Sequence, residues 1–431
     1  MDSVWLQTAQ LPKFDLLRSD LKTDVLIIGG GMAGLLCAYK LAQAGVDYAL
    51  VEADRICGGI TKNTTAKITS QHGLIYDKLI REFGVERARL YLEANQAALE
   101  EYRTLCRGID CDFEEKGAFV YSIDNRKKLE QELAALDRLG FAAELVDHIS
   151  LPFPVAGAVK FERQAQFHPL KFAASTARDL RIFEHTKVLK LAPGKAVTNS
   201  GTISAEIIIA ATHFPLLNKH GGYFLKLYQH RSYVLALKNA PEVKGMYVDE
   251  DEKGLSFRNY DNLLLLGGGS HRTGKQGGGW QELERFASRH YPGARETARW
   301  ATQDCMTLDS VPYIGPYSKH TSGLYVVTGF NKWGMTSSMA AAALLTDLVL
   351  GRDNPYASVF APSRTVLRPQ LVMNGLESTL GFLTPTVPRC PHLGCALKYN
   401  AAEHSWDCPC HGSRFEEDGT LIDNPAASNK Q

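Results

Sequence analysis

The spacing of hydrophobic residues near the start of the chain changes from a continuous run to a helical repeat. Residues 25–28 are all apolar, glycines follow, and apolar residues then recur at Leu35, Leu36, Ala38 and Leu41. A short apolar run fits a buried strand, and the later spacing places its members on one face of a helix. The pattern predicts a strand, a tight turn and a helix, with a second strand at residues 48–51.

The glycines in this turn have the spacing of a dinucleotide-binding loop. Gly29 permits the tight turn, Gly31 lets a pyrophosphate approach the backbone, and Gly34 lets the helix pack on the sheet. The free N–H groups at the helix N-terminus then face the phosphates. The second strand ends at Glu52, 18 residues after Gly34, where a carboxylate is placed to bind the ribose of an adenosine. A glycine-rich turn without a ligand is the alternative, but strand, helix and acid together favour a dinucleotide site.

Later segments extend the same layer. Residues 57–73 are small and rich in hydroxyl groups, which suits a loop around a pyrophosphate, and residues 181–191 and 206–215 have the composition of returning strands. Residues 323–351 combine a strand, a glycine-bearing turn and a helix that begins near Gly334. A second helix N-terminus is therefore expected to face the cofactor from far along the chain.

The composition excludes several kinds of partner. The chain has 431 residues, with 48 Lys and Arg against 47 Asp and Glu, so no net charge attracts nucleic acid or an anionic membrane. No apolar run reaches the roughly 20 residues of a membrane span, and the N-terminus lacks the basic and apolar segments of a signal peptide. Five scattered cysteines have the pattern of reduced, buried thiols. We expect a cytoplasmic protein that acts on a small molecule.

Four cysteines and two histidines near the C-terminus have the spacing of metal ligands. They lie in two boxes, CPHLGC at 390–395 and CPCH at 408–411. A mononuclear zinc site uses two cysteines and two histidines. Zinc therefore leaves one extra cysteine in each box, Cys395 and Cys410, without a role.

Residues 20–355 resemble the D-amino-acid oxidase superfamily of FAD enzymes. The resemblance rests on the glycine fingerprint, on HPLKFAASTA (168–177) and on LDSVPYIGP (308–316). It implies an α/β fold with a Rossmann-like FAD-binding layer and a mixed-sheet substrate subdomain. It also implies that Glu52 holds the ribose, that the backbone at Val188 meets adenine, and that N–H groups of residues 334–336 face the N1/O2 edge of the flavin. The expected FAD-binding residues are Gly29, Gly31, Gly34, Glu52, Gly59, Thr61, Val188, Gly329, Gly334, Met335 and Thr336.

The C-terminal boxes resemble those of Rieske [2Fe-2S] proteins, which form a small module of β-strands and loops. This resemblance implies that Cys390 and Cys408 bind one iron and that His392 and His411 bind the other. It also implies a disulfide between Cys395 and Cys410, whose redox state in a reducing compartment stays open.

Residues after the last ligand are expected to tune the cluster. The Ser413 hydroxyl is expected to donate to a cluster sulfur, which raises the reduction potential. Phe415 stands where high-potential Rieske proteins have a tyrosine donor. The expected potential therefore lies below the top of the range of about −150 to +300 mV that Rieske centres cover. The segment 424–426, Asn-Pro-Ala, resembles the one that covers the cluster.

The chain departs from each family at one place. Relatives that oxidise amino acids often have an arginine shortly before the D-x-x-P segment, where it pairs with the substrate carboxylate, but residues 300–312 read WATQDCMTLDSVP. This weakens the case for a free amino acid as substrate. The candidates for substrate binding or acid–base catalysis are His72, His271, Arg272, Gln303, Asp304 and Lys332. Residues 358–389 are short for the strands that precede a Rieske box, so we expect the flavin domain to supply the missing wall.

The resemblances predict three successive parts of the chain. An FAD-dependent oxidoreductase domain is expected at 1–357, a linker at 358–385 and a Rieske domain at 386–431. Within the first part, the FAD layer is expected at about 20–95, 156–215 and 301–355, and the substrate sheet at about 96–155 and 216–300.

These resemblances together imply an FAD-dependent dehydrogenase. A small amine or amino-acid-like substrate would transfer a hydride to FAD, and electrons would pass singly through the Rieske cluster to an acceptor protein or a quinone-like acceptor. The alternative is an electron-transfer or redox-sensing protein that turns over no organic substrate. The missing arginine favours this alternative, whereas the complete oxidase-like layer favours the enzyme.

Overall fold

The first sheet begins with the predicted strand, turn and helix. In the computed structural model, which describes residues 2–430 apart from 218–219, 365–368, 386–387 and 427, β1 (Leu21–Ile28) leads into α2 (Met32–Gln43). The strand order is β16-β17-β10-β1-β2-β7, and a β8–β9 hairpin pairs with β10. The central strands are parallel. The other strands are β2 (Tyr48–Val51), β7 (Ile182–Phe183), β8 (Val188–Ala192), β9 (Lys195–Thr198), β10 (Thr202–Ala210), β16 (Tyr313–Pro316) and β17 (Leu324–Thr328).

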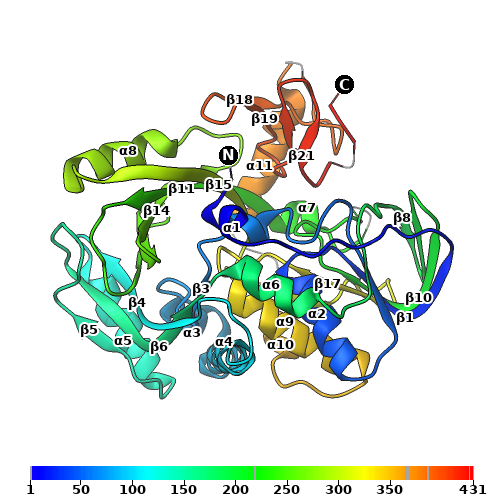
Figure 1. Cartoon of the computed structure of the whole chain (residues 1–431), viewed down its shortest axis with the longest axis horizontal. Coiled ribbons are helices and arrows are strands. Elements are labelled where there is room, and N and C mark those ends of the chain that lie inside the picture. Colours follow the sequence, from blue (N-terminus) through cyan, green and yellow to red (C-terminus); the bar gives the residue numbers. More distant parts are fainter. Residues whose placement is uncertain (1, 218–219, 365–368, 386–387, 427, 431) are drawn as a thin grey trace.

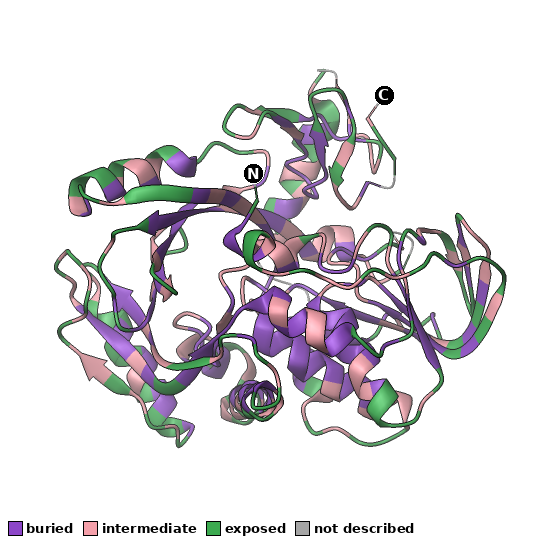
Figure 2. Ribbon diagram, in the orientation of Figure 1, coloured by how far each residue is buried: buried purple, intermediate pink, exposed green. Residues whose placement is uncertain are grey.

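The helical repeat of α2 faces the core of this layer. Leu35, Leu36, Ala38 and Leu41 have no exposed surface, as their spacing predicted. α2 packs against α9 (Gly334–Val349), the helix expected from residues 323–351, and Figure 2 shows both as largely buried. Burying a leucine side chain stabilises a fold by about 1.5–3 kcal/mol, so this face anchors the glycine turn to the sheet.

The second sheet is mixed and stands beside the first (Figure 1). Its order is β15-β11-β14-β13-β12-β4-β6-β3, with β5 paired to β6. It extends beyond the ranges expected for a substrate sheet, because β3, β6 and the end of β15 also belong to it. The strands are β3 (Lys67–Ile68), β4 (Glu114–Ser122), β5 (Glu144–Val146), β6 (Gly157–Gln166), β11 (Leu227–Lys238), β12 (Met246–Asp249), β13 (Ser256–Tyr260), β14 (Leu263–Arg272) and β15 (Arg295–Thr307).

Helices surround the two sheets. α8 (Gly279–His290) lies on β14 and β11, α5 (Arg126–Arg138) contacts β6, and α4 (Val85–Cys106) packs on α9. The shorter helices of this part are α1 (Val4–Thr8), the 3₁₀ turn η1 (Ile60–Asn63), α3 (Tyr76–Phe83), α6 (Pro169–Ala177), α7 (Tyr223–Lys226) and α10 (Ala357–Phe360).

The C-terminal part is a small four-stranded antiparallel sheet preceded by a helix. α11 (Pro369–Leu383) occupies much of the segment expected as a linker. The expected start of the last domain, residue 386, lies outside the described residues. The strands are β18 (Lys398–Asn400), β19 (Ser405–Asp407), β20 (Arg414–Glu416) and β21 (Leu421–Asp423). Figure 1 shows this part in orange and red against β11 and β15.

Candidate functional site

The turn between β1 and α2 requires glycine at two positions. Gly29 has a φ of +110°, and a Cβ there would lie 2.6 Å from the Ala211 carbonyl oxygen. A Cβ on Gly34 would lie 1.9 Å from the carbonyl oxygen of Gly29. Any side chain at these positions would displace the turn, so the fingerprint holds β1, β10 and the start of α2 in close contact.

Glu52 lies at the end of β2 and is fixed by backbone N–H groups. Gly30 donates to its Oε2 at 2.7 Å, and Asp54 donates to its Oε1 at 3.0 Å. Burial raises the pKa of this carboxyl, while these N–H donors lower it. The carboxylate is therefore held in one orientation beside the glycine turn.

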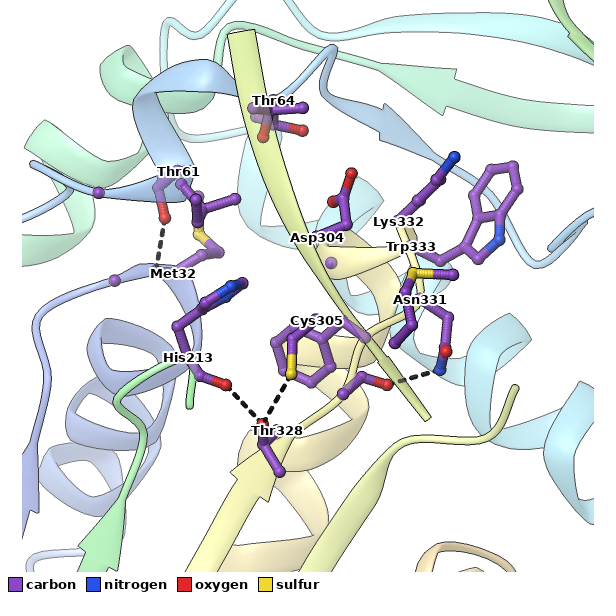
Figure 3. A pocket seen from close by; sticks show the side chains of 18 of the residues that line it. Met32, Thr61, Thr64, His213, Asp304, Cys305, Thr328, Asn331, Lys332 and Trp333 are labelled. Carbon is purple, nitrogen blue, oxygen red and sulfur yellow. Dashed lines mark hydrogen bonds between the residues drawn. The ribbon is translucent and has the colours of Figure 1, made fainter. Parts of the chain in front are cut away.

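A cavity of about 860 Å³ connects this turn with the start of α9. One part of its wall contains the fingerprint and Glu52. Another contains the loop before α9, whose residues Asn331, Lys332 and Trp333 are labelled in Figure 3. Of the predicted FAD-binding residues, the wall includes Gly29, Gly31, Glu52, Gly59, Thr61, Val188, Gly329, Gly334 and Met335. Gly34 instead packs against the turn, and the Thr336 hydroxyl donates to the Thr69 carbonyl oxygen at 2.9 Å.

The donors along this cavity fit an extended dinucleotide. The wall presents the N-terminal turns of two helices, α2 and α9, whose first backbone N–H groups have no partner inside the helix. Thr61 orders the first of these turns, because its hydroxyl accepts from the Met32 N–H at 3.0 Å. The residues present therefore fit FAD, although the role of each one in binding it stays a prediction.

Strand β15 presents one residue series to the cavity and the other to the C-terminal part. Thr302 and Asp304 line the cavity. Gln303, between them, points to the opposite face of the strand, where its Nε2 donates to the Gly412 carbonyl oxygen at 2.8 Å. Because successive side chains of a strand alternate, the same stretch of β15 both lines the cavity and contacts the C-terminal domain.

The histidine and arginine candidates already have structural partners. His72 borders the cavity, but its Nδ1 lies 2.7 Å from the Tyr91 hydroxyl and burial lowers its pKa to about 3. His271 is stacked on Tyr233 and does not line the cavity. Arg272 faces the C-terminal domain, where its Nε donates to the Pro409 carbonyl oxygen at 3.3 Å.

Asp304 and Lys332 are the two candidates whose charged groups lie at the cavity without an ion-pair partner among the described residues. Burial raises the pKa of Asp304 to about 6, and the positive charges of Lys332 and Arg231 oppose this rise. The Lys332 ammonium donates to the Ser270 hydroxyl at 3.4 Å. Asp304 makes no side-chain hydrogen bond within the described part of the chain.

The four expected cluster ligands come together from two loops. Cys390 and Cys408 are within hydrogen-bonding range of each other, and the imidazole centroids of His392 and His411 are 4.9 Å apart. Both ring nitrogens of His411 are buried and lack a hydrogen-bond partner. Because a buried polar atom without a partner is costly, a metal ion is the fitting partner for this imidazole. The ligand set of two thiolates and two imidazoles fits a Rieske cluster.

The other two cysteines lie beside this group. The sulfur atoms of Cys395, Cys408 and Cys410 lie within 4.8 Å of one another, and all nine cysteines have free thiols. α11 covers the pair, since a Cβ on Gly381 would lie 2.7 Å from the Cys410 sulfur. Cys395 and Cys410 are thus close in space, and their disulfide stays a prediction.

The residues expected to tune the cluster are buried. Ser413 has no exposed surface, its Oγ accepts from the Ala426 N–H at 3.0 Å, and its hydroxyl also interacts with the Cys390 thiol. Phe415 is also fully buried and belongs to the small core around the cysteines. The Asn424 side chain leaves this core and donates to the Thr212 carbonyl oxygen in the flavin domain at 2.7 Å.

The C-terminal domain is docked on the second sheet by buried polar contacts. Glu403 accepts from Arg231 Nε at 3.0 Å and from the Tyr233 hydroxyl at 3.1 Å. Its other oxygen accepts from Arg414 Nη2 at 2.8 Å. Glu403 thereby joins a strand of the flavin domain to the core of the cluster domain.

Sequence reasoning did not identify the segment that connects the two sites. Phe214, just beyond β10, has ring-centroid distances of 6.1 Å to His392 and 6.4 Å to His411. Three residues earlier, Ala211 touches Gly29, and between them His213 lines the cavity with a φ of +59° (Figure 3). The only sequence signal was the expected strand at 206–215, and a strand pattern carries no information about the domain that packs against its end.

Comparison with family models places two known domains on this chain. The model named DAO, FAD dependent oxidoreductase, matches residues 24–348. The model of the Rieske [2Fe-2S] domain matches residues 376–431. The two sites built above lie in these two ranges.

Individual relatives agree with the family models. A Rieske 2Fe-2S iron-sulfur protein of Bacillus subtilis, YhfW, is 36% identical over 99% of this chain and 96% of its own length. Gamma-glutamylputrescine oxidoreductase of Escherichia coli is 26% identical over 85% of this chain and 94% of its own.

Solved structures share the fold of the larger part. Glycine oxidase from Geobacillus kaustophilus has a TM-score of 0.68 and 20% identity, and it covers 80% of this chain and 100% of its own. L-Proline dehydrogenase from P. horikoshii has a TM-score of 0.67 and 16% identity, with 80% and 98% covered. Among the described helices of this chain, none has the length and apolar character needed to cross a membrane.

Proposed function

Because the chain belongs to the DAO family of FAD-dependent oxidoreductases and ends in a Rieske [2Fe-2S] domain, we propose that it is a dehydrogenase of small amines or amino-acid-like compounds. It takes two electrons from the substrate and delivers them singly to an external acceptor, either a protein or a quinone-like molecule. FAD, when bound, accepts a hydride from carbon, and the iron–sulfur cluster carries one electron at a time.

One observation carries this proposal. The imidazoles expected to bind the cluster pack on Phe214, in the same segment whose Ala211 touches the glycine turn of the FAD site. Residues 421–426 of the C-terminal domain also form part of the wall of the cavity. A docked cluster beside the flavin cavity suits transfer of electrons within one chain and needs no mobile arm.

The residues of the chain have separable tasks in this reaction. The two helix N-termini and Glu52 would hold the cofactor, and strands of the second sheet line the rest of the cavity. Lys332, from the loop before α9, places a positive charge beside the Ser270 hydroxyl at the cavity. A fixed positive charge at this end stabilises negative charge that develops during reduction.

The names of similar proteins support an amine as the substrate. They include an oxidoreductase of gamma-glutamylputrescine, an oxidase of glycine and a dehydrogenase of L-proline. Location in the cytoplasm belongs to the same proposal, and the free, buried thiols at Cys37, Cys57, Cys106, Cys111 and Cys305 support it.

Anaerobic mixing of the holoprotein with candidate amines tests the proposal. We expect loss of flavin absorbance, followed by loss of the cluster absorbance and the appearance of a Rieske-type EPR signal. If NADH, NADPH or a reduced partner protein reduces the flavin while no amine does so, the protein is an electron-transfer module and the proposal is wrong.

A further inference from the structure

Asp304 is a charged group at the cavity that has no hydrogen-bond or ion-pair partner among the described residues. Its carboxylate lines the cavity and makes no hydrogen bond and no ion pair with any described residue. Figure 3 shows Asp304 and Lys332 on the same side of the cavity, away from His213. Asp304 is half-buried at the cavity, and a carboxylate in such a position without a protein partner destabilises the fold, so its retention points to a ligand.

The groups around Asp304 do not neutralise it. Lys332 binds the Ser270 hydroxyl rather than the carboxylate. His230, opposite Asp304 in the register of β11 and β15, is uncharged because burial and nearby positive groups lower its pKa to about 3. Arg231, the next residue, pairs with Glu403 on the other face of the strand.

The rest of this wall is also acidic. The end of β12 and the loop after it contribute Asp249, Glu250, Asp251 and Glu252 to the cavity. Glu250 pairs with Lys128 at 2.7 Å, and Glu252 lies 3.2 Å from the uncharged imidazole of His230. Asp249 and Asp251 each accept from a backbone N–H group of the same loop. These carboxylates add negative charge to the same cavity wall as Asp304, which favours a cation over a carboxylate as its ligand.

We propose that Asp304 binds a second, unreactive ammonium group of the substrate, so that the preferred substrates are aliphatic diamines and related cationic amines. This inference rests on the proposed function, because it assumes that an amine is oxidised in this cavity. The amine that loses the hydride must be uncharged, whereas the ammonium held by Asp304 keeps its proton. One carboxylate thus selects the substrate and positions its reacting end.

A matched series of three ligands tests the inference. The probes 1,4-diaminobutane, butylamine and 4-aminobutyrate have similar length and carry, at the far end, a positive, a neutral and a negative group. In anaerobic stopped-flow mixing with the holoprotein, the diamine is expected to have the lowest apparent Kd for flavin reduction and 4-aminobutyrate the highest. Asp304→Asn should raise the apparent Kd of the diamine by roughly 10- to 100-fold and change that of butylamine little.

Two further variants separate binding from folding. Asp304→Glu keeps the charge and should keep the preference for the diamine. Asp353→Asn makes the same chemical change at an exposed position and should behave as the wild type. Flavin content and melting temperature of each variant show whether it is folded, so a loss of preference in a folded Asp304→Asn protein reports the charge alone.

The outcomes distinguish this inference from the proposed function. Equal use of the three ligands, a preference for 4-aminobutyrate, or an unchanged preference in Asp304→Asn overturns the inference while leaving amine oxidation intact. If no amine reduces the flavin, the proposed function fails, and the shift of the flavin absorption band on binding still ranks the three ligands. Binding of the diamine that Asp304→Asn does not weaken would then overturn the inference as well.

Discussion

At the scale of single residues, the Asp304 carboxylate, which has no partner in the described part of the chain, lowers the stability of the fold by an amount that can be measured. Its folded-state pKa of about 6 lies above the ordinary value of 3.8. The unfolded chain therefore releases this proton at lower pH than the folded chain, and stability falls as pH rises from about 4 to 6. Asp304→Asn should stabilise the protein by about 1–2 kcal/mol at pH 7, after allowance for partial exposure to solvent.

Melting temperatures measured at several pH values check this predicted direction of the change in stability. The melting temperature of Asp304→Asn should exceed that of the wild type at pH 7, and the difference should disappear near pH 4. A lower melting temperature of Asp304→Asn at pH 7 would mean that the carboxylate has a stabilising partner. The gain in stability together with loss of diamine preference is the pattern expected of a residue kept for function.

A second residue-scale prediction concerns the metal. Both ring nitrogens of His411 are buried without a partner, whereas His404 lies exposed between the boxes. His411→Asn should contain no Rieske-type cluster, because it removes one of two imidazole ligands. His404→Asn is the matched control and should retain iron, acid-labile sulfide and the EPR signal. One zinc per chain in the wild type would instead support the mononuclear site.

At the scale of elements, the contact between β11 and the turn before β19 depends on one buried acid. Burial tends to raise the pKa of Glu403, but Arg231 and Arg414 hold it below its ordinary value of 4.5. A depressed folded-state pKa gives stability that is present above pH 4.5 and lost as pH falls through the folded pKa. Glu403→Gln should cost about 3–5 kcal/mol at pH 7, because it leaves two buried guanidinium groups short of a partner.

Acid titration of unfolding measures this contact. The wild type should lose stability below about pH 4.5 more steeply than Glu403→Gln, so the two curves converge in acid. Glu417→Gln is a suitable control, since that carboxylate lies on the exposed surface of the same domain. Parallel curves for wild type and Glu403→Gln would contradict a role of Glu403 in the acid response.

The elements also show which features could be predicted from the sequence and which could not. The glycine turn, Glu52 and the ligand boxes were predictable because their geometry is local: neighbouring residues and fixed spacings define it. By contrast, neighbouring residues do not determine which part of the molecule each face of a strand contacts. Gln303 and Asp304 are adjacent candidates in sequence, yet one bonds the cluster domain and the other borders the cavity. Arg272 turned toward the cluster domain for the same reason.

At the scale of the whole molecule, the short C-terminal domain is completed by its neighbour. The sequence predicted that the flavin domain supplies a wall, and the segment 211–214 and strands β11 and β15 lie there. The identity of Phe214 was not predictable, because its contact with both imidazoles depends on the docking of two domains and on no motif. Two cofactor sites therefore meet through one connecting segment.

This arrangement predicts that Phe214 affects the second electron-transfer step and not the first. The rate of electron transfer falls steeply with distance and with gaps in packing, and Phe214→Ala opens a gap beside His392 and His411. In anaerobic stopped-flow mixing, the flavin of Phe214→Ala should be reduced at the wild-type rate, while reduction of the cluster should be at least about 10-fold slower. Phe382→Ala is the control, because this ring is 49% exposed on α11 and belongs to the covering helix.

The EPR-monitored reduction potential of the cluster should be nearly unchanged in both variants. This measurement separates a change in electronic coupling between flavin and cluster from a change in the driving force of electron transfer. Equal cluster reduction in Phe214→Ala and wild type would show that electrons leave the flavin domain by another route.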